Sequence, residues 1–212
     1  PARARATILP SDLSGLQLWL KADAGVEKAG GLPASTGDTV ALWRDSSGAG
    51  NDGVGVKDPI LGDPSAHLLP AVVFEGGGTG DGFDTPVTLG AGVASTYFVV
   101  FAADNPTLNR RLVNATGPTA SDFRSYSKGT TSDPSVVTTY DGANAYRGTT
   151  TINDPRWHIG VLRADTHNIE HFVDGDPDPL VSFVGTPGKY NLQAVTDLKV
   201  GYSGKTNEGL DG

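Results

Sequence analysis

Cysteine and methionine are absent from this chain of 212 residues, and glutamate is scarce. The lack of cysteine excludes disulfides, thiol catalysis and thiolate metal sites. It fits an extracellular bacterial or virion protein as well as a cytosolic one. Of the 24 acidic residues only four are Glu, at positions 27, 75, 170 and 208. Because Asp favours turns and Glu favours helices, this bias favours β structure.

Long apolar runs are also missing, since no stretch approaches the roughly 20 residues of a membrane span. The first ten residues, PARARATILP, hold no hydrophobic segment of the secretion-signal type. Pro1 fits either a natural start from which an initiator Met was trimmed or a fragment of a longer chain. A net charge of −8 disfavours non-specific binding to nucleic acid or to an anionic membrane. We therefore expect no nucleic-acid partner and no membrane insertion.

What the chain does contain is a period of two, with 29 Gly and 14 Pro to supply turns. The pattern predicts strands at 16–20, 39–45, 70–76, 82–89, 96–102, 110–116, 122–128, 135–141, 146–152, 157–163, 169–175, 180–184 and 197–203. So many short strands in one domain indicate an all-β fold, a two-sheet antiparallel sandwich. We expect 46–66 to be a long loop. Strand 96–102 is apolar on both faces and is expected to lie centrally, covered on each side.

Residues 156–175, RWHIGVLRADTHNIEHFVDG, read as a hairpin. Alternate residues from Trp157 to Val161 share one face, and alternate residues from Ile169 to Val173 share another. Asp174-Gly175 offers the positive backbone angles that a tight turn needs. We expect Trp157 to pack between the sheets, and we interpret the other two tryptophans, Trp19 and Trp43, as packing residues as well.

Three stretches resemble the bacterial and phage laminin-G-like, concanavalin A-like jelly rolls. The first is LSGLQLWLKADAGV followed by VALWRDSSGAGNDG, similar to that group's opening strand and its Trp-x-Asp-x-Ser-Gly turn. The second is PAVVFEGGGTGDGFDTP, similar to its strand and Phe-Asp-Gly loop. The third is the hairpin, which looks like its Trp-His…Val-Asp-Gly signature. The resemblance implies a jelly roll spanning 12–212, preceded by an N-terminal arm, 1–11.

The end of the chain departs from that family. A last strand, which in the family pairs beside the first, is apparently missing after VGYSGKTNEGLDG. Its absence would leave LQLWL, residues 16–20, with an open apolar edge. We expect this edge to be completed by a further segment or by other protein subunits, since strand donation is a known mode of assembly.

The family's catalytic motifs are not present, so we predict that the chain is not an enzyme. Its glycosidases carry Glu-x-Asp-x-x-Glu on one strand, but no two Glu here lie that close. Its polysaccharide lyases use a Gln-x-His, which does not occur, and no Gly-x-Ser-x-Gly elbow is found. Since the fold hosts lectins, adhesins, hydrolases and virion proteins, the site residues have to decide.

A glycan site needs an aromatic platform and planar polar groups. The middle third of the chain is richest in both, and Tyr140 and Tyr146 flank a loop that presents Asn144. The alternative is that these tyrosines cover sheet edges. The predicted carbohydrate-binding residues are Arg124, Tyr126, Tyr140, Asn144 and Tyr146.

Metal binding is the other option that the residues offer. Asp174 and Asp176 begin an Asp-x-Asp-x-Asp run, but a calcium loop needs Gly and Glu where Pro179 and Gly185 stand. We therefore assign no metal and keep Ca²⁺ as an alternative, at this loop or at the turn between Asp45 and Asp52. His167 and His171 stand four apart, a metal spacing on a helix but not on a strand. We expect His171 to be a hydrogen-bonded, semi-buried core residue.

Taken with the resemblance, these observations favour a non-catalytic, surface-exposed binding or adhesion module that recognises a glycan or cell-surface polysaccharide. We expect it on an extracellular or virion surface. The alternative is a structural subunit of a larger assembly, such as a phage capsid decoration or tail protein.

Overall fold

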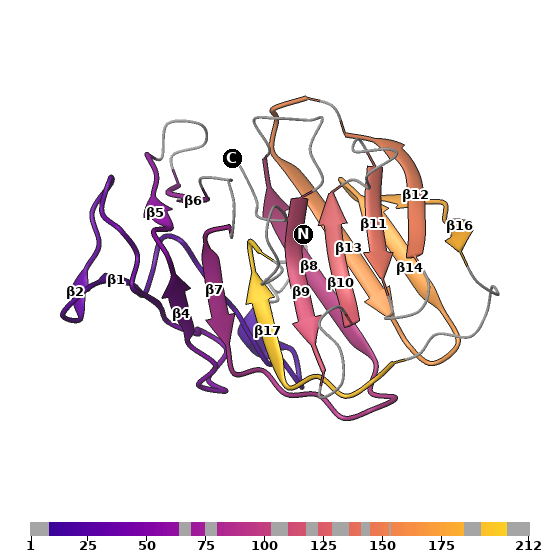
Figure 1. The fold of residues 1–212 in the computed structure, drawn as a ribbon, viewed down its shortest axis with the longest axis horizontal. Coiled ribbons are helices and arrows are strands. Elements are labelled where there is room, and N and C mark those ends of the chain that lie inside the picture. The colour runs from indigo at the N-terminus through magenta and orange to yellow at the C-terminus, as the bar shows by residue number, and fades with distance from the viewer. Residues whose placement is uncertain are drawn as a thin grey trace, which may run out of the picture.

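The computed structural model describes residues 9–63, 69–74, 80–102, 110–117, 123–128, 136–140, 145–152, 154–184 and 192–202. These residues form antiparallel strands, and the one helical element among them is a 3₁₀ turn, η1 (Pro10–Asp12). The predicted all-β, two-sheet antiparallel sandwich of the jelly-roll type is confirmed (Figure 1).

The strands are short in the first third of the chain and longer after it. The first eight are β1 (Val26–Lys28), β2 (Leu32–Pro33), β3 (Leu42–Trp43), β4 (Gly53–Val56), β5 (Ile60–Leu61), β6 (Val72–Val73), β7 (Gly82–Thr85) and β8 (Ser95–Phe101). The others are β9 (Arg110–Thr116), β10 (Phe123–Lys128), β11 (Val136–Tyr140), β12 (Ala145–Thr151), β13 (His158–Ala164), β14 (Ile169–Val173), β15 (Asp176–Asp178), β16 (Val181–Val184) and β17 (Asp197–Val200).

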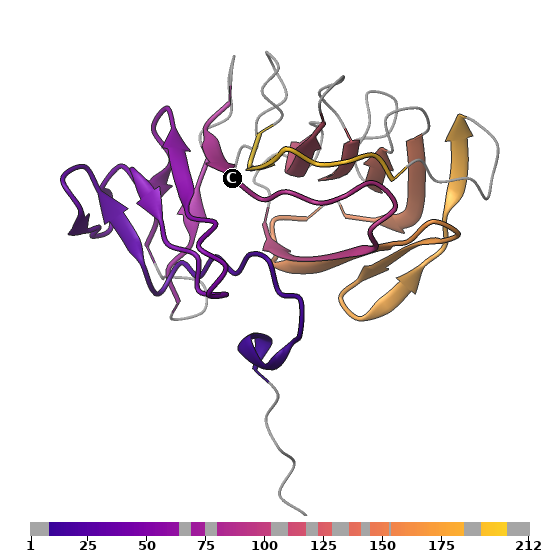
Figure 2. The same cartoon turned by 90° about the horizontal axis from the view of Figure 1, so that it is seen from below.

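Two sheets make up the sandwich. The large sheet has the order β16-β12-β11-β10-β9-β17-β7-β4-β3-β1-β2, and the small, four-stranded sheet has the order β15-β14-β13-β8. A separate pair, β5-β6, completes the described strands. Figure 2 shows that the four-stranded sheet covers the half of the large sheet formed by β9 to β12.

Alternation on β13 and β14 sets the core between the sheets. His158, Gly160, Leu162 and Ala164 are buried, whereas the residues between them face outward. Gly160 is required because Tyr126 reaches across from β10. A Cβ at position 160 would lie 2.4 Å from the Tyr126 hydroxyl oxygen. Glycine there lets the ring pack directly on the opposite strand.

A second part of the core lies at the β1–β7 end of the large sheet. Phe83 on β7 is fully buried, and its ring centroid lies 5.2 Å from that of Trp43 and 6.1 Å from that of Phe74. Both ring pairs have the edge-to-face geometry that aromatic pairs prefer. Trp43 is thus a packing residue, as predicted.

The tight turn of the hairpin is confirmed. Asp174 and Gly175 have φ angles of 54° and 92°. The Asp174 carboxylate accepts a hydrogen bond from the Ile159 N–H at 2.8 Å and contacts His158 Nδ1 at 2.8 Å. This side chain therefore ties the turn back to the start of β13.

Two segments that were predicted to be buried are exposed, and both contribute to the outward side of the four-stranded sheet. Trp157 does not pack between the sheets: it is 36% exposed, because the inward positions start at His158. Strand β8 is not central. It forms an edge of the four-stranded sheet, and Phe98 and Val100 face solvent.

Two predicted elements in the first third are also corrected. Residues 16–20 form no extended strand; Leu20 makes a single bridge to Asp45. The Trp19 N–H donates to the Asp45 carboxylate, and the Trp19 carbonyl accepts from Ser46 N–H. The open edge expected there is therefore partly satisfied by the following turn. Trp19 itself is half-buried. The loop expected at 46–66 instead contains β4 and β5.

Candidate functional site

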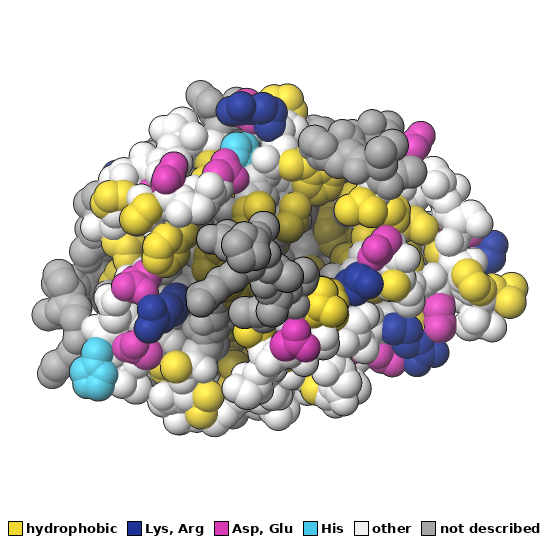
Figure 3. Space-filling model, turned by 180° about the vertical axis from the view of Figure 1, so that it is seen from behind, with side chains coloured by type: hydrophobic (Ala, Val, Ile, Leu, Met, Phe, Trp, Pro, Cys, Tyr) yellow, Lys and Arg dark blue, Asp and Glu magenta, His cyan; other side chains and the backbone are white. Residues whose placement is uncertain are grey.

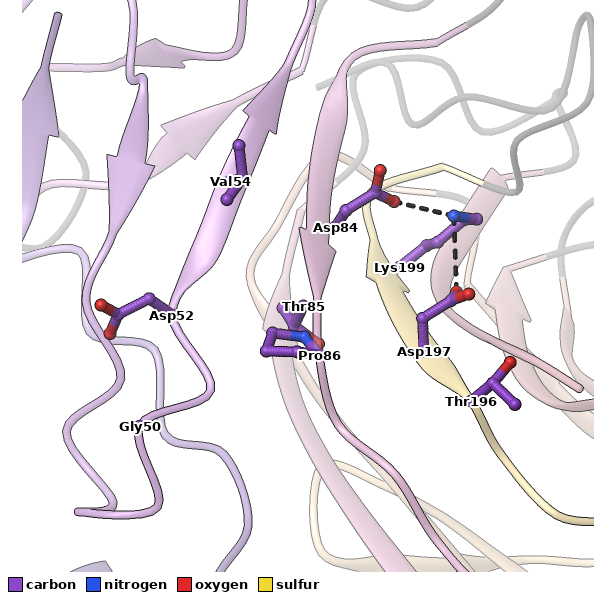
Figure 4. Close-up of a pocket in the computed structure, with 9 residues that line it drawn as sticks. All are labelled: Gly50, Asp52, Val54, Asp84, Thr85, Pro86, Thr196, Asp197 and Lys199. Carbon is purple, nitrogen blue, oxygen red and sulfur yellow. Dashed lines mark hydrogen bonds and ion pairs between the residues drawn. The ribbon is translucent and has the colours of Figure 1, made fainter.

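A cleft of about 480 Å³ lies on the outer face of the large sheet, over β4, β7 and β17 (Figure 4). Three neighbouring strands and the segments beside them contribute its walls. It is lined by Gly50, Asp52, Val54, Asp84, Thr85, Pro86, Thr196, Asp197 and Lys199.

Strand register places the central side chains in one row. Val54 pairs with Asp84, and Asp84 pairs with Lys199. Directly paired residues of adjacent antiparallel strands point to the same side of a sheet. The residues that alternate with them, Phe83 and Leu198, are buried in the core. The core therefore fixes the orientation of the polar row.

Lys199 and Asp84 form the polar centre of the cleft. Lys199 Nζ donates to Asp84 Oδ1 at 2.8 Å and lies 3.4 Å from Asp197 Oδ1. Tyr202 Oη donates to the same Asp84 oxygen at 2.5 Å. Burial alone would lower the pKa of Lys199, but its hydrogen bond to Asp84 and the two nearby carboxylates raise it. The side chain is therefore held as an ammonium ion between two acids.

Burial and the Asp84 carboxylate raise the pKa of the Tyr202 hydroxyl, which stays protonated and acts as a donor. The Lys199 ammonium also lies 5.4 Å from the centroid of the Tyr202 ring. Thr85 is buried at the base of the cleft and donates to the Leu198 carbonyl at 2.9 Å, which fastens β7 to β17.

The same face continues beyond the cleft. Asn114 on β9 pairs with Lys199 and so points to the same side, where it is fully buried. On β11 and β12, Tyr140 and Arg147 also face outward, because Thr139 and Tyr146, which alternate with them, pair with each other on the inner side. The outer face of the large sheet thus carries polar side chains across several strands.

Two of the five predicted carbohydrate-binding residues lie in the core. Tyr126 and Tyr146 are buried in the core, so neither ring offers a surface for a sugar. Tyr140 is half-buried on the outer face. Arg124 lies in β10, but its side chain is outside the described part of the chain, as is Asn144. A binding role for these last three residues stays a prediction.

The carboxylates considered for calcium are hydrogen-bonded to nearby backbone and side-chain groups. Asp45 accepts hydrogen bonds from the N–H groups of Trp19, Ser47 and Asn51 and from the Ser47 hydroxyl. Burial alone would raise the pKa of Asp45, but these bonds lower it. Asp52 accepts from the Asp45 N–H and from Arg44.

At the other candidate, Asp174 is occupied by its turn bonds to Ile159 and His158, and Asp176 is exposed on β15. Within the described ranges, no group of three or more His, Asp or Glu side chains is arranged to hold a metal ion.

His171 is a buried core residue, as expected, although it is more deeply buried than the semi-buried position predicted. Its Nε2 lies 2.6 Å from Thr139 Oγ1 on the opposite sheet, and its ring contacts Tyr126 edge-on. Burial lowers the pKa of His171 to about 4, although the charge of Asp178 acts in the opposite direction. The imidazole is therefore neutral near pH 7.

The sequence reasoning missed Asp84, Asp197 and Lys199. Each lies in a strand that was predicted, but the pairing of β7 with β17 joins segments 115 residues apart. A signal was available in the alternation itself, since Asp84 follows the buried Phe83 and Lys199 follows the buried Leu198. Chemically, the cleft offers carboxylate acceptors, hydroxyls and one ammonium around the apolar Val54 and Pro86. Such a lining suits a ligand that has both hydroxyl groups and C–H surface.

A transmembrane helix is not found in the described part of the chain: none of its helices has the length and apolarity needed to cross a bilayer.

No protein-family model matches the chain, and no curated protein matches it. Among solved structures it is similar to Trypanosoma rangeli sialidase, with 16% identity, a TM-score of 0.50, and coverage of 89% of this chain and 32% of that chain. It is also similar to the binding domain of Paraclostridial Mosquitocidal Protein 1, with 10% identity, a TM-score of 0.43, and coverage of 84% and 49%.

A third similar structure is Bacillus licheniformis beta-glucanase, with 16% identity, a TM-score of 0.35, and coverage of 93% of this chain and 88% of that chain. The chain spans about a third of the length of the sialidase. At such identities the likeness shows the fold alone, and the match to part of the sialidase agrees with the antiparallel β-sandwich described above.

Proposed function

We propose that this chain is a non-catalytic, laminin-G-like module that binds glycans in the cleft over β4, β7 and β17. The observation that carries the proposal is the row Val54–Asp84–Lys199, in which apolar and charged side chains from three adjacent strands line one open cleft. Sugars are recognised by this combination, because hydroxyl groups need hydrogen-bond partners and ring C–H faces need apolar contact. The shared fold with a sialidase supports a glycan ligand by analogy.

The charge of the lining narrows the class of glycan. Three carboxylates line the cleft, those of Asp52, Asp84 and Asp197, together with the ammonium of Lys199, and Asp52 is also paired with Arg44, which leaves an excess of negative charge. An acidic sugar would meet net negative charge there, whereas neutral hydroxyls can donate to the carboxylates. The proposed ligands are therefore neutral glycans, presented on a cell surface or in a polysaccharide.

Binding without turnover is the expected activity. Asp84 is bonded to Lys199 and Tyr202, and Asp197 is paired with Lys199. Asp52 accepts hydrogen bonds from Arg44 and from the Asp45 N–H. A glycosidase needs one carboxyl group to deliver a proton and a second to act as base or nucleophile. Carboxylates that are held by an ammonium ion and by hydrogen bonds within a turn are placed for ligand binding rather than for proton transfer or nucleophilic attack.

A glycan array followed by calorimetry tests the proposal. We expect the chain to bind neutral glycans in preference to sialylated or uronic ones, and to leave them uncut. The substitution Val54→Arg fills the cleft from an exposed strand position and should weaken binding about tenfold or more. Val93→Arg is the matched control, since Val93 is similarly exposed but does not line the cleft.

Equal affinities for the Val54→Arg and Val93→Arg variants would place the ligand elsewhere and contradict the cleft. Release of new reducing ends from bound oligosaccharides, abolished by Asp197→Asn, would contradict the non-catalytic assignment.

A further inference from the structure

The four-stranded sheet has an apolar outer face, which is the surface that the sequence predicted to be covered. Phe98 is 70% exposed, Val100 65%, Ile159 49% and Trp157 36%. We call this surface the apolar strip; it consists of these four side chains together with the half-buried Val161 and Phe172. Figure 3 shows this side of the molecule, where hydrophobic side chains lie in several groups with charged side chains around and between them.

Strand register arranges the side chains of the apolar strip in rows. Phe98 pairs with Val161, Val161 with Phe172, and Phe172 with Pro177, so one row crosses all four strands. Val100 and Ile159 form the next row. Neighbouring strands lie about 4.8 Å apart, so Phe98 and Phe172 are roughly 10 Å apart and the row is roughly 14 Å long. The result is an open, rigid strip with an aromatic ring on every second strand.

Charged residues border the strip but leave it neutral. Arg163 pairs with Glu170 at 3.3 Å beyond one end. Arg156 pairs with Asp154 at 2.8 Å near the other end. The chain as a whole has a net charge of −8, so this neutral strip differs from the average surface. Among the residues that the structure describes, the charges bordering the strip are paired with one another, so this surface favours an uncharged ligand over a charged one.

The exposed area of the strip indicates whether it would bind a small ligand or a second protein. Large aromatic and aliphatic side chains have on the order of 150–250 Å² of surface, so the four most exposed residues contribute roughly 400 Å². The half-buried Val161 and Phe172 add less than about 150 Å². Each partner in a standard protein–protein interface buries about 800 Å². The strip alone is too small for a stable dimer, but it matches the footprint of a short run of sugar rings.

We propose that the apolar strip on the four-stranded sheet is a second glycan-binding surface, which takes an uncharged polysaccharide chain running across β8, β13 and β14. Sugar C–H faces would pack on Phe98 and Phe172, with Val100 and Ile159 alongside. This surface lies on the opposite sheet from the cleft and does not depend on it. It suits the flat side of an extended or crystalline chain, whereas the cleft suits hydroxyl-rich soluble segments.

Sedimentation with insoluble polysaccharides tests the proposal on the full 212-residue chain. Microcrystalline cellulose, chitin and mannan serve as neutral probes, and insoluble alginate gel serves as a charged one. We expect depletion by at least one neutral probe and none by alginate. Phe98→Gln should lower the association constant about tenfold, because an aromatic contact is replaced by a polar side chain.

Two control variants distinguish binding at the strip from binding in the cleft and from a general effect of substitution. Leu32→Gln changes a residue that is 58% exposed on β2, away from the strip, and should leave sedimentation unchanged. Val54→Arg, which blocks the cleft, should also leave it unchanged. Loss of sedimentation in Val54→Arg but not in Phe98→Gln would assign all binding to the cleft and overturn the second surface.

Sedimentation velocity over a range of protein concentrations completes the test. No depletion of the wild-type chain by any neutral probe would overturn the proposal, and it would leave binding of soluble glycans in the cleft to be judged by the array. The chain could instead self-associate without binding polysaccharide, and Phe98→Gln could abolish that self-association. This result would identify the apolar strip as a protein interface and would overturn the proposal as well.

Discussion

Replacement of Phe83 by alanine is expected to lower the free energy of unfolding by about 3–5 kcal/mol. Phe83 is fully buried on β7 and forms edge-to-face pairs with Trp43 and Phe74. Gly53 packs against it so closely that a Cβ there would lie 3.2 Å from the Phe83 Cβ. Truncation would leave a cavity that these rings cannot fill. Urea unfolding followed by tryptophan fluorescence measures the change.

The matched control is Phe98→Ala, the same substitution at a residue that is largely exposed on β8. It should cost less than about 1 kcal/mol, as surface substitutions usually do. Because Phe83 also fixes the strand that presents Asp84, the Phe83→Ala variant should lose glycan affinity as well. A cost below about 1 kcal/mol for Phe83→Ala would contradict the packing described for this end of the sandwich.

Acidification is expected to destabilise the protein by about 2–3 kcal/mol through His171 alone, between about pH 7 and pH 4.5. Burial holds the pKa of His171 near 4, below the ordinary value of 6.5. In this window the unfolded chain binds a proton that the folded chain does not. Stability from the neutral imidazole is therefore present above about pH 6.5, and it is lost as the pH falls toward the folded pKa.

The variant His171→Gln isolates this contribution, since glutamine does not titrate and can still bond to Thr139. Other acids titrate equally in both proteins, so the difference between their pH profiles belongs to His171. We expect the variant to be less stable near pH 7 but to lose less stability on acidification. Parallel profiles for the two proteins would show that His171 is protonated as easily in the folded chain as in the unfolded one.

The sequence was informative where strands are long. Strands β8 to β14 were predicted to within a residue or two, because alternation over five to seven residues is hard to mistake. In the first third, β3 and β6 have two residues each and exist because β1, β4 and β5 pair with them. The predicted segments 39–45 and 70–76 contain only these two short strands, because no local pattern shows where pairing begins or ends. Strand β4 was missed because two of its four residues are glycine, which strands disfavour.

The inward side of β13, the first strand of the hairpin, was predicted wrongly. The large residues Trp157 and Ile159 suggested that their side points inward, but the inward positions hold His158 and Gly160. The small residue is needed because Tyr126 fills the space above Gly160. A contact between two sheets decided the orientation, and only the folded structure contains it.

The strand pairing that forms the cleft could not be predicted for a similar reason, although alternation places Asp84 and Lys199 on the outward side of their strands. Asp84 and Lys199 are each ordinary surface residues of a strand, and only the pairing of β7 with β17 makes them a site. Tyr126 and Tyr146 were chosen because aromatic residues serve sugars well. Both, however, fall on the inner side of their strands, where the same rings serve the core.

Chemical-shift mapping by nuclear magnetic resonance tests most directly whether the cleft binds a glycan. The chain, labelled with nitrogen-15, would be titrated with the tightest soluble neutral oligosaccharide found on the array. We expect saturable shifts that are largest for the amides of Val54, Asp84 and Lys199, with no change at Leu32 on β2, which does not line the cleft. Shifts confined to other parts of the chain, or none at ligand concentrations well above the measured dissociation constant, would contradict a binding site in the cleft.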